Sequence, residues 1–280
     1  YRTGSEGALI QTLKAEGENP KADIFMTVDA GNLWYATEEG LLSSLKSEIL
    51  EKNVSDHLQD IKNRWFGLSV RARTTVVNTD KVDPTEKLSY QGLADKKWKG
   101  ELCLRTSKKV YNQSLVAMLI VMHGKEKAKK IVSGWVTNTV DIFSSDTAVL
   151  EAVAAGRCSV GVVNTYYFGR LKRKKPQLPL KIVWPNQDSY GVHVNISGAG
   201  LVKNAPNSKE AKKFLEWLSS KKAQKEFAQA NMEYPVNKNS ALAPEVKSWG
   251  KFKANTEFNL TQAGKLQKEA IKLMHEVGYK

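Results

Sequence analysis

The stretch Ser159–Tyr167 reads SVGVVNTYY and carries the pattern from which the fold is predicted. Val160–Val163 is a short, continuously apolar run, which is typical of a strand buried on both faces of a sheet. Asn164 ends the run, and two adjacent tyrosines, Tyr166 and Tyr167, follow close behind. In α/β sheets, ligands bind beyond the carboxyl ends of the strands, so this strand end is a candidate binding site.

Outward from this stretch, the chain alternates between strand and helix patterns. Strands are predicted at 22–28, 65–78, 99–105, 159–164, 181–185 and 193–202, and helices at 8–16, 32–39, 111–123, 147–155, 208–230 and 265–277. Several of the strands are continuously apolar. The pattern therefore predicts an α/β architecture with mainly parallel sheets.

Length and composition describe an ordinary folded protein. The 280 residues suffice for about two domains, and the 41% hydrophobic and 26% charged residues exclude disorder, collagen and a small disulfide-rich scaffold. No apolar run reaches about 18 residues, so no transmembrane helix is predicted. Dinucleotide-binding, P-loop, nucleophile-elbow and zinc-protease motifs do not occur after the strands, and we expect the protein not to be an enzyme.

The chain is strongly basic, with a net charge of +14, which favours anionic partners or surfaces. Its densest basic run is Arg170–Lys175, and Pro176 directly after it predicts a loop. No RNA-binding or zinc-finger pattern accompanies the run, so we expect no nucleic-acid partner. A basic nucleic-acid-binding protein is the least favoured alternative.

Two cysteines, Cys103 and Cys158, allow two interpretations. They form one disulfide in an oxidising compartment, or they are two buried thiols. A zinc site would need more soft ligands than these two cysteines and four scattered histidines.

The adjacent tyrosines are the unusual feature of the sequence. In a regular strand neighbouring side chains point to opposite faces, so the ordinary interpretation is one core tyrosine and one surface tyrosine. The alternative is a paired phenol site at a cleft. A phenol has a reference pKa of about 10, and only a strongly charged cation such as Fe³⁺ favours the phenolate near neutral pH. A Ca²⁺ site would be rich in carboxylates, which this segment is not.

The segment Asn164–Leu171 (NTYYFGRL) resembles the metal-site motif of ferric-iron-binding proteins. These bacterial transferrins are the periplasmic solute-binding components of bacterial iron ABC transporters. Other segments resemble the family in the same order and spacing, at 22–29, 66–73, 98–100, 111–115, 185–187, 193–198 and 233–236. The resemblance covers essentially the whole chain.

The resemblance implies a two-lobed type 2 periplasmic-binding-protein fold, with two α/β domains joined by hinge strands. The N-terminal lobe would comprise residues 1–72 plus 192–242, without the family's first strand and helix, and the C-terminal lobe residues 73–191 plus 243–280. Fe³⁺ would lie in the cleft between the lobes, bound by Tyr111, Tyr166 and Tyr167, as in the tyrosine-rich branch of the family.

The resemblance also directs attention to residues that support the iron ligands. Arg71 and Arg73 have the same strand parity and so face one side, where one of them would offset the phenolate charge or hold an anion such as carbonate. An ordinary salt bridge is the alternative for both. His193 is expected on a hinge strand in a structural role.

A second set of polar residues is expected beside the metal. An anion pocket at a helix N-terminus would draw on Asn164, Ser145, Asp146 and Thr147. Some family members carry a glutamate ligand where this chain has Val28, and Asp29 comes next. The tyrosine-rich branch lacks that glutamate, so the departure selects a branch of the family.

The resemblance further implies export and a single disulfide. The family topology places the strands of Cys103 and Cys158 in one lobe, which predicts a Cys103–Cys158 bond. The sequence begins at Tyr1 without a methionine or a signal peptide, so we expect a processed or truncated chain whose visible ligand set is incomplete. A periplasmic monomer that delivers Fe³⁺ to an inner-membrane ABC permease is expected. The alternative is a binding protein of the same fold for an oxyanion or a polyamine.

Overall fold

β3 (Phe66–Asn78) is the strand around which the molecule is organised. The computed structural model describes residues 1–280 as a mixed α/β protein. The other strands are β1 (Ile24–Val28), β2 (Leu42–Ser43), β4 (Leu102–Arg105), β5 (Thr139–Phe143), β6 (Val160–Asn164), β7 (Leu180–Val183) and β8 (Val194–Val202). The helices are α1 (Glu6–Glu16), α2 (Ala30–Glu38), α3 (Glu48–Asn53), α4 (Val110–His123), α5 (Lys125–Asn138), α6 (Asp146–Ala154), α7 (Thr165–Lys174), α8 (Ser208–Leu218), α9 (Lys221–Asn231), α10 (Pro244–Ser248), α11 (Thr261–Lys265) and α12 (Gln267–Glu276).

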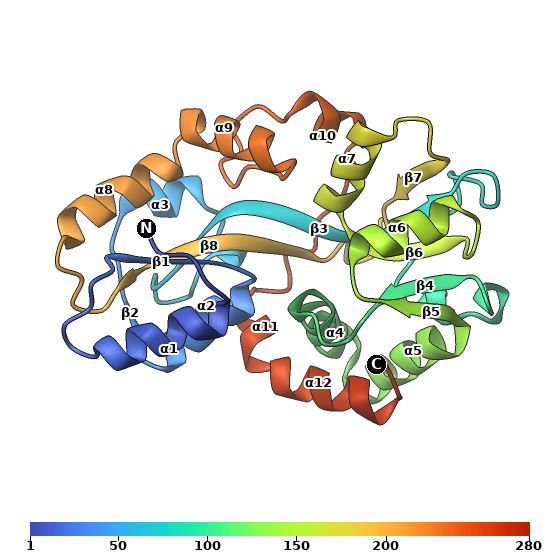
Figure 1. Ribbon diagram of the computed structural model, residues 1–280, viewed down its shortest axis with the longest axis horizontal. Helices are drawn as coiled ribbons and strands as arrows, with labels where there is room; N and C mark the ends of the chain where they lie inside the picture. Colours follow the sequence, from blue (N-terminus) through green and yellow to red (C-terminus); the bar gives the residue numbers. More distant parts are fainter.

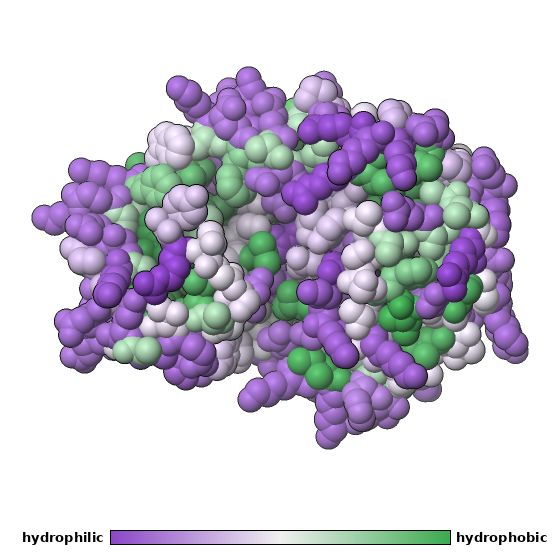
Figure 2. Space-filling view, viewed as in Figure 1, coloured by the Kyte–Doolittle hydropathy of each residue, from purple (hydrophilic) through white to green (hydrophobic).

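The eight strands pair in the order β1-β8-β3-β6-β4-β5, with β2 on β8 and β7 on β3. β3 pairs with β8 through Ala72 and with β6 from Arg73 onward, so it changes its partner between these two residues. Figure 1 shows strands and helices gathered at two ends of the molecule, with β3 and β8 running between them. On the same face, Figure 2 shows a hollow between the two ends.

The prediction of mainly parallel sheets is wrong. Only β4 pairs in parallel, with β5 and with β6, whereas every pair made by β3 and β8 is antiparallel. The continuous apolar runs reflect burial on both faces, and helices that cover both faces produce such burial for either strand direction. The direction of pairing is therefore not encoded in the apolar pattern.

The prediction of a loop at Arg170–Lys175 is also wrong for most of that run. Arg170 to Lys174 form the last turns of α7, which ends before Lys175. Positive side chains in the last helical turn are favoured by the helix dipole, so a basic run before a proline is compatible with a helix C-terminus. No helix of the structure has both the length and the apolar character needed to cross a membrane.

Cys103 and Cys158 form a disulfide, with their Cα atoms 5.9 Å apart. Cys103 lies in β4, and Cys158 precedes β6, the parallel neighbour of β4. Both cysteines are buried in an apolar cluster that also includes Val149 and Phe168. The disulfide implied by the family resemblance is therefore confirmed, and the bond ties together the two strands that lead to the candidate site.

Reduction of this disulfide is expected to lower the free energy of unfolding by about 4 kcal/mol, because the bond closes a loop of 55 residues in the unfolded chain. Urea unfolding of the oxidised protein and of the protein held reduced measures the difference. Mass spectrometry of the unreduced protein checks the starting state, and two free thiols there would contradict the assignment.

Candidate metal centre

Tyr166 and Tyr167 lie in the first turn of α7, directly after β6 ends at Asn164. Their ring centroids are 4.3 Å apart, and the ring planes are tilted by 35°. The chain turns from strand to helix at Thr165, so the opposite-face rule for strands does not apply to the pair. This local turn brings both phenols into one region.

Tyr111 reaches the same region from α4, a helix that follows β4 in the chain. Its hydroxyl oxygen lies 3.4 Å from that of Tyr166. Tyr166 is buried, while Tyr111 and Tyr167 are half-buried and keep contact with solvent. The structure thus brings together the three tyrosines that the sequence and the family resemblance singled out.

Both tyrosine-bearing helices begin at the site without a side-chain cap. Lys109 precedes α4 and Asn164 precedes α7, and neither side chain accepts a hydrogen bond from its own helix. The first N–H groups of a helix and its dipole favour negative charge nearby. The two helix starts therefore suit a site that takes up negatively charged oxygen atoms.

Three guanidinium groups surround the phenols. Arg71 lies 5.7 Å and Arg105 5.4 Å from the Tyr111 ring centroid. Arg105 also lies 5.8 Å from the Tyr167 ring, and Arg170 lies 5.0 Å from the Tyr166 ring. Arg71 Nε and Nη2 and Arg105 Nε and Nη1 are buried without a hydrogen-bond partner. These positive charges and unpaired donors suit a site that takes up anionic oxygen atoms.

Burial opposes this effect of the arginines. It raises the pKa of the Tyr166 phenol well above its ordinary value, and the neighbouring Tyr111 raises that pKa further, while Arg71 lowers it. Burial likewise raises the pKa of Tyr111, against the lowering influence of Tyr166, Arg71 and Arg105. Both phenols are therefore neutral at neutral pH unless a cation lies against them.

Arg73 and Asp146 form a buried ion pair under the site, with Nη1 3.2 Å from Oδ2. Arg73 also donates to Asn164 and to Asn112, the residue after Tyr111. Asp146 accepts from the backbone N–H of Asn164. This network therefore connects the starts of α4, α6 and α7. Asn164 Nδ2 is buried without a partner.

The remaining predicted residues lie at the start of α6, at the start of α2 and directly before β8. Ser145 caps α6 by accepting from the Ala148 N–H, and Thr147 follows in the first turn of α6. Asp29 is the buried N-cap of α2, and burial raises its pKa to about 6. His193 is buried directly before β8, and burial lowers its pKa to about 3, so it is neutral at physiological pH.

The sequence patterns did not indicate Arg105, Arg170 or Glu233 as part of this region. Arg105 is the last residue of β4 and lies inside the predicted strand 99–105, whereas candidate ligands were expected beyond the strand ends. Arg170 lies within the segment Asn164–Leu171 that resembles the metal-site motif, but only its place in the basic run was interpreted, as part of a loop. Glu233 is buried, accepts from Ser69, and lies 3.8 Å from Arg71.

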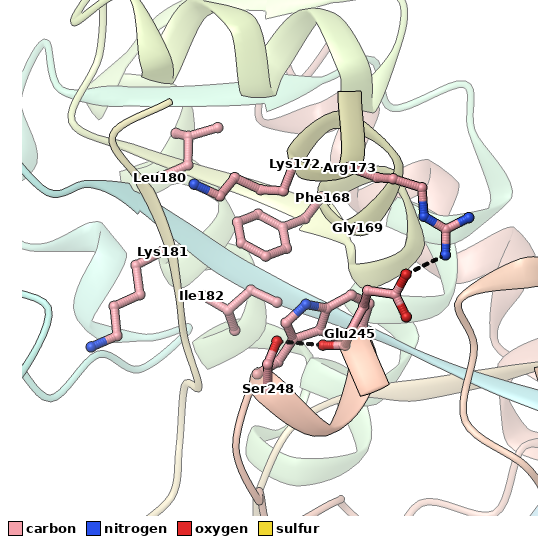
Figure 3. Close-up of a pocket in the computed structure, with 10 residues that line it drawn as sticks. Phe168, Gly169, Lys172, Arg173, Leu180, Lys181, Ile182, Glu245 and Ser248 are labelled. Carbon is pink, nitrogen blue, oxygen red and sulfur yellow. Dashed lines mark hydrogen bonds and ion pairs between the residues drawn. The ribbon is translucent and has the colours of Figure 1, made fainter. Parts of the chain in front are cut away.

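A surface pocket of about 300 Å³ lies where α7 meets α10 and β7, and it includes none of the three tyrosines. Figure 3 shows Phe168 and Gly169 of α7 facing it, with Arg173 paired to Glu245 of α10. Lys172 donates to the backbone carbonyls of Pro176 and Leu178. The cations of α7 at this pocket are thus already paired.

Gly169 is where α7 packs most closely on its neighbours. A Cβ atom there would lie 2.6 Å from Cζ2 of Trp249 and 2.7 Å from Sδ of Met232. We expect Gly169→Ala to lower the free energy of unfolding by about 1–3 kcal/mol through overpacking, and to weaken metal binding by shifting α7. Denaturant unfolding and a metal titration measure both effects.

Gly7→Ala is the matched control for Gly169→Ala. Gly7 lies within α1, and a Cβ atom there would meet nothing within 4 Å. This exchange is expected to leave metal binding unchanged and to stabilise the helix slightly. Equal behaviour of the two variants would contradict the close packing of α7.

No group of three or more His, Cys, Asp or Glu side chains in the structure is arranged to hold a metal. The three tyrosines are the candidate ligand set because their rings and hydroxyl groups converge. Residues 19–257 match the family described as "Bacterial extracellular solute-binding protein". The chain belongs to this family.

This solute-binding protein is similar to several iron proteins. It is 42% identical to iron uptake protein A1 of Synechocystis sp. (strain ATCC 27184 / PCC 6803 / Kazusa), over 99% of this chain and 79% of that protein. It is 25% identical to the major ferric iron-binding protein of Neisseria meningitidis serogroup B (strain ATCC BAA-335 / MC58), over 97% of this chain and 82% of that protein.

Solved structures agree with the fold predicted from the resemblance. A Trichodesmium protein described in complex with iron and citrate ligands superposes with a TM-score of 0.96 at 45% identity, covering 99% of this chain and 90% of its own. Ferric iron-binding protein A of Mannheimia haemolytica, in an open conformation, gives a TM-score of 0.91 at 34% identity, covering 96% and 87%. The predicted family and its two-lobed α/β fold are therefore confirmed for this solute-binding protein.

Proposed function

We propose that this protein captures Fe³⁺ as the solute of an ABC transporter, through the phenolate oxygens of Tyr111, Tyr166 and Tyr167. The observation that carries the proposal is the convergence of these tyrosines at two uncapped helix starts, with two phenol oxygens 3.4 Å apart. Fe³⁺ is a hard cation whose charge favours the phenolate over the phenol. The names of the similar iron uptake and ferric iron-binding proteins support the same cargo.

We assign residues 1–72 plus 192–242 to one lobe and 73–191 plus 243–280 to the other. The change of β3 from β8 to β6 between Ala72 and Arg73 supports this division. All three tyrosines then belong to the second lobe. Closure of the first lobe over the bound ion, by rotation about β3 and β8, would exclude water from the cleft.

A small anion completes the site in this proposal. Arg71, Arg105 and Asn164 hold buried N–H groups that have no hydrogen-bond partner within the protein, although Arg105 Nη1 lies 3.6 Å from Asp146 Oδ2. A carbonate or carboxylate oxygen would satisfy these donors and fill coordination positions that three phenolates leave open. Asp146 pairs with Arg73 and lies near Arg105, and the Arg73–Asp146 pair acts on the site by holding the starts of α4, α6 and α7 together.

Delivery to an inner-membrane permease follows from this role. We place the protein in the periplasm as a monomer that releases its ion when the permease binds it. The disulfide and the periplasmic location named for a similar Fe(3+)-binding protein of Serratia marcescens support this compartment.

Titration of the metal-free protein with ferric citrate tests the proposal. Phenolate-to-Fe³⁺ charge transfer is expected to produce a visible absorption band that saturates at one ion per chain. Equilibrium dialysis against phosphate and spermidine examines the alternative solutes under the same conditions. A protein that takes up either of these and shows no visible band with ferric citrate would contradict the proposal.

A further inference from the structure

A buried chain of hydrogen bonds joins the start of α2 to α4 through the strand β8. Asn195 of β8 donates from Nδ2 to Asp29 Oδ2, at 2.8 Å, and to Ser114 Oγ, also at 2.8 Å. Ser114 Oγ lies 3.1 Å from His193 Nε2. All four side chains are buried. In the division proposed above, Asp29 belongs to the first lobe and Ser114 to the second.

The amide of Asn195 is fixed in one orientation. Its Oδ1 accepts from the backbone N–H groups of Ala30 and Ile196, at 3.1 and 2.8 Å. An amide has two donor hydrogens and two acceptor positions, so Asn195 uses its full capacity. A flipped amide would turn its NH₂ group toward two N–H donors and its oxygen toward the Asp29 carboxylate. Asn195 therefore acts as a rigid link.

The hydrogen bond from Asn195 reaches α4 at Ser114, one helical turn after Tyr111. Residues three apart on a helix lie on neighbouring positions of its surface, so Ser114 holds the turn that carries Tyr111. His193 and Asn195 are two residues apart near the start of β8, and Ser114 contacts both of their side chains. Asn195 also lies directly opposite Arg71 in the β3–β8 ladder, and Arg71 faces the Tyr111 ring.

We propose that Ser114 and Asn195 are positioning residues for the iron site. They connect the start of α2 to α4 through hydrogen bonds and thereby fix the position of Tyr111 in the cleft. Neither residue touches the metal. The inference rests on the proposed function, because Tyr111 is taken to be an iron ligand. It adds a connection between the two lobes that the ligand set itself does not contain.

Ser114→Ala tests the link in two backgrounds, wild type and Tyr111→Phe. Iron affinity is measured by competition with a chelator, and the charge-transfer band is recorded for each variant. We expect Ser114→Ala to weaken binding by about 10-fold in the wild type, as for other losses of an outer partner, and to shift the band. In the Tyr111→Phe background the same exchange is expected to have no effect, because the residue it positions no longer binds iron.

Asn195→Ala breaks the same link from the strand side and is expected to reproduce the Ser114→Ala result. Ser219→Ala is the matched control. Ser219 is also a buried serine whose hydroxyl makes two hydrogen bonds, with Asn53 and with the Glu216 carbonyl, but it lies in the first lobe, outside this link. Thermal unfolding identifies any variant that fails to fold. If Ser114→Ala or Asn195→Ala does not fold, the iron affinity of the remaining one of the two tests the positioning role.

The outcomes separate the inference from the function on which it rests. Loss of affinity by the same factor in both backgrounds would show a general structural effect and overturn the positioning role. Unchanged affinity in Ser114→Ala, together with weakened binding in Tyr111→Phe, would overturn it while the iron function stands. A wild-type protein without a band or iron uptake would instead overturn the proposed function.

Discussion

Replacing Tyr167 with Phe is expected to lower the affinity for Fe³⁺ by more than about 100-fold, since the loss of an outer partner of a ligand already costs about 10–100-fold. The exchange removes one oxygen atom and keeps the ring, whose centroid lies 4.3 Å from that of Tyr166, so the fold should survive. The visible band is expected to weaken as well, because one of three phenolate-to-metal transitions disappears. Competition against a chelator of known ferric affinity measures the change.

Tyr190→Phe is the matched control for the ligand exchange. The Tyr190 hydroxyl bonds to His123 and to Gln91, both at 3.2 Å, so this variant also loses a hydroxyl with hydrogen bonds. It is expected to leave the affinity and the band unchanged. Tyr167→Phe with wild-type affinity and an unchanged band would remove Tyr167 from the ligand set, whatever the control shows.

The sequence predicted the grouping of the tyrosines better than it predicted their surroundings, and the reason is physical. Tyr166 and Tyr167 are adjacent, so their proximity is a local property that any fold must keep. Residues 65–78 are correctly predicted as a strand, but β3 is buried along all 13 residues. Its polar positions, which include Ser69, Arg71 and Arg73, therefore face a polar interior and not solvent.

The residues that went unnoticed depend on tertiary contacts. Arg105 reaches Tyr167 because β4 and β6 are neighbours in the sheet, and it also faces Tyr111 of α4, which follows β4. Asn195 and Ser114 are 81 residues apart, and their hydrogen bond forms only when the fold brings the start of β8 to α4. A single sequence shows local spacing and residue chemistry, whereas such long-range pairs follow from the topology. The direction of strand pairing was missed for the same reason.

Iron retention is expected to fall steeply as the pH is lowered, because each phenolate ligand must lose a proton before it binds. Burial raises the pKa of Tyr166 and of Tyr111, so both are protonated in the metal-free protein at neutral pH. Loading with Fe³⁺ therefore releases protons, and acid favours the metal-free form. Each phenol that binds releases one proton. For three phenol ligands the logarithm of the Fe³⁺ affinity is therefore expected to rise by about three per pH unit.

A retention titration against a chelator, corrected for the chelator's own protonation, measures this slope. Tyr111→Phe removes one proton-releasing ligand, so its slope is expected to be lower by about one per pH unit. Tyr190→Phe should keep the wild-type slope, because its hydroxyl lies outside the ligand set. Carboxylate ligands, with reference pKa values near 4, would already be ionised and would give almost no slope at neutral pH. A corrected affinity that does not change with pH would therefore contradict a site of three phenolates. The wild-type slope in Tyr111→Phe would contradict it as well, because every phenol must release its proton when it binds Fe³⁺.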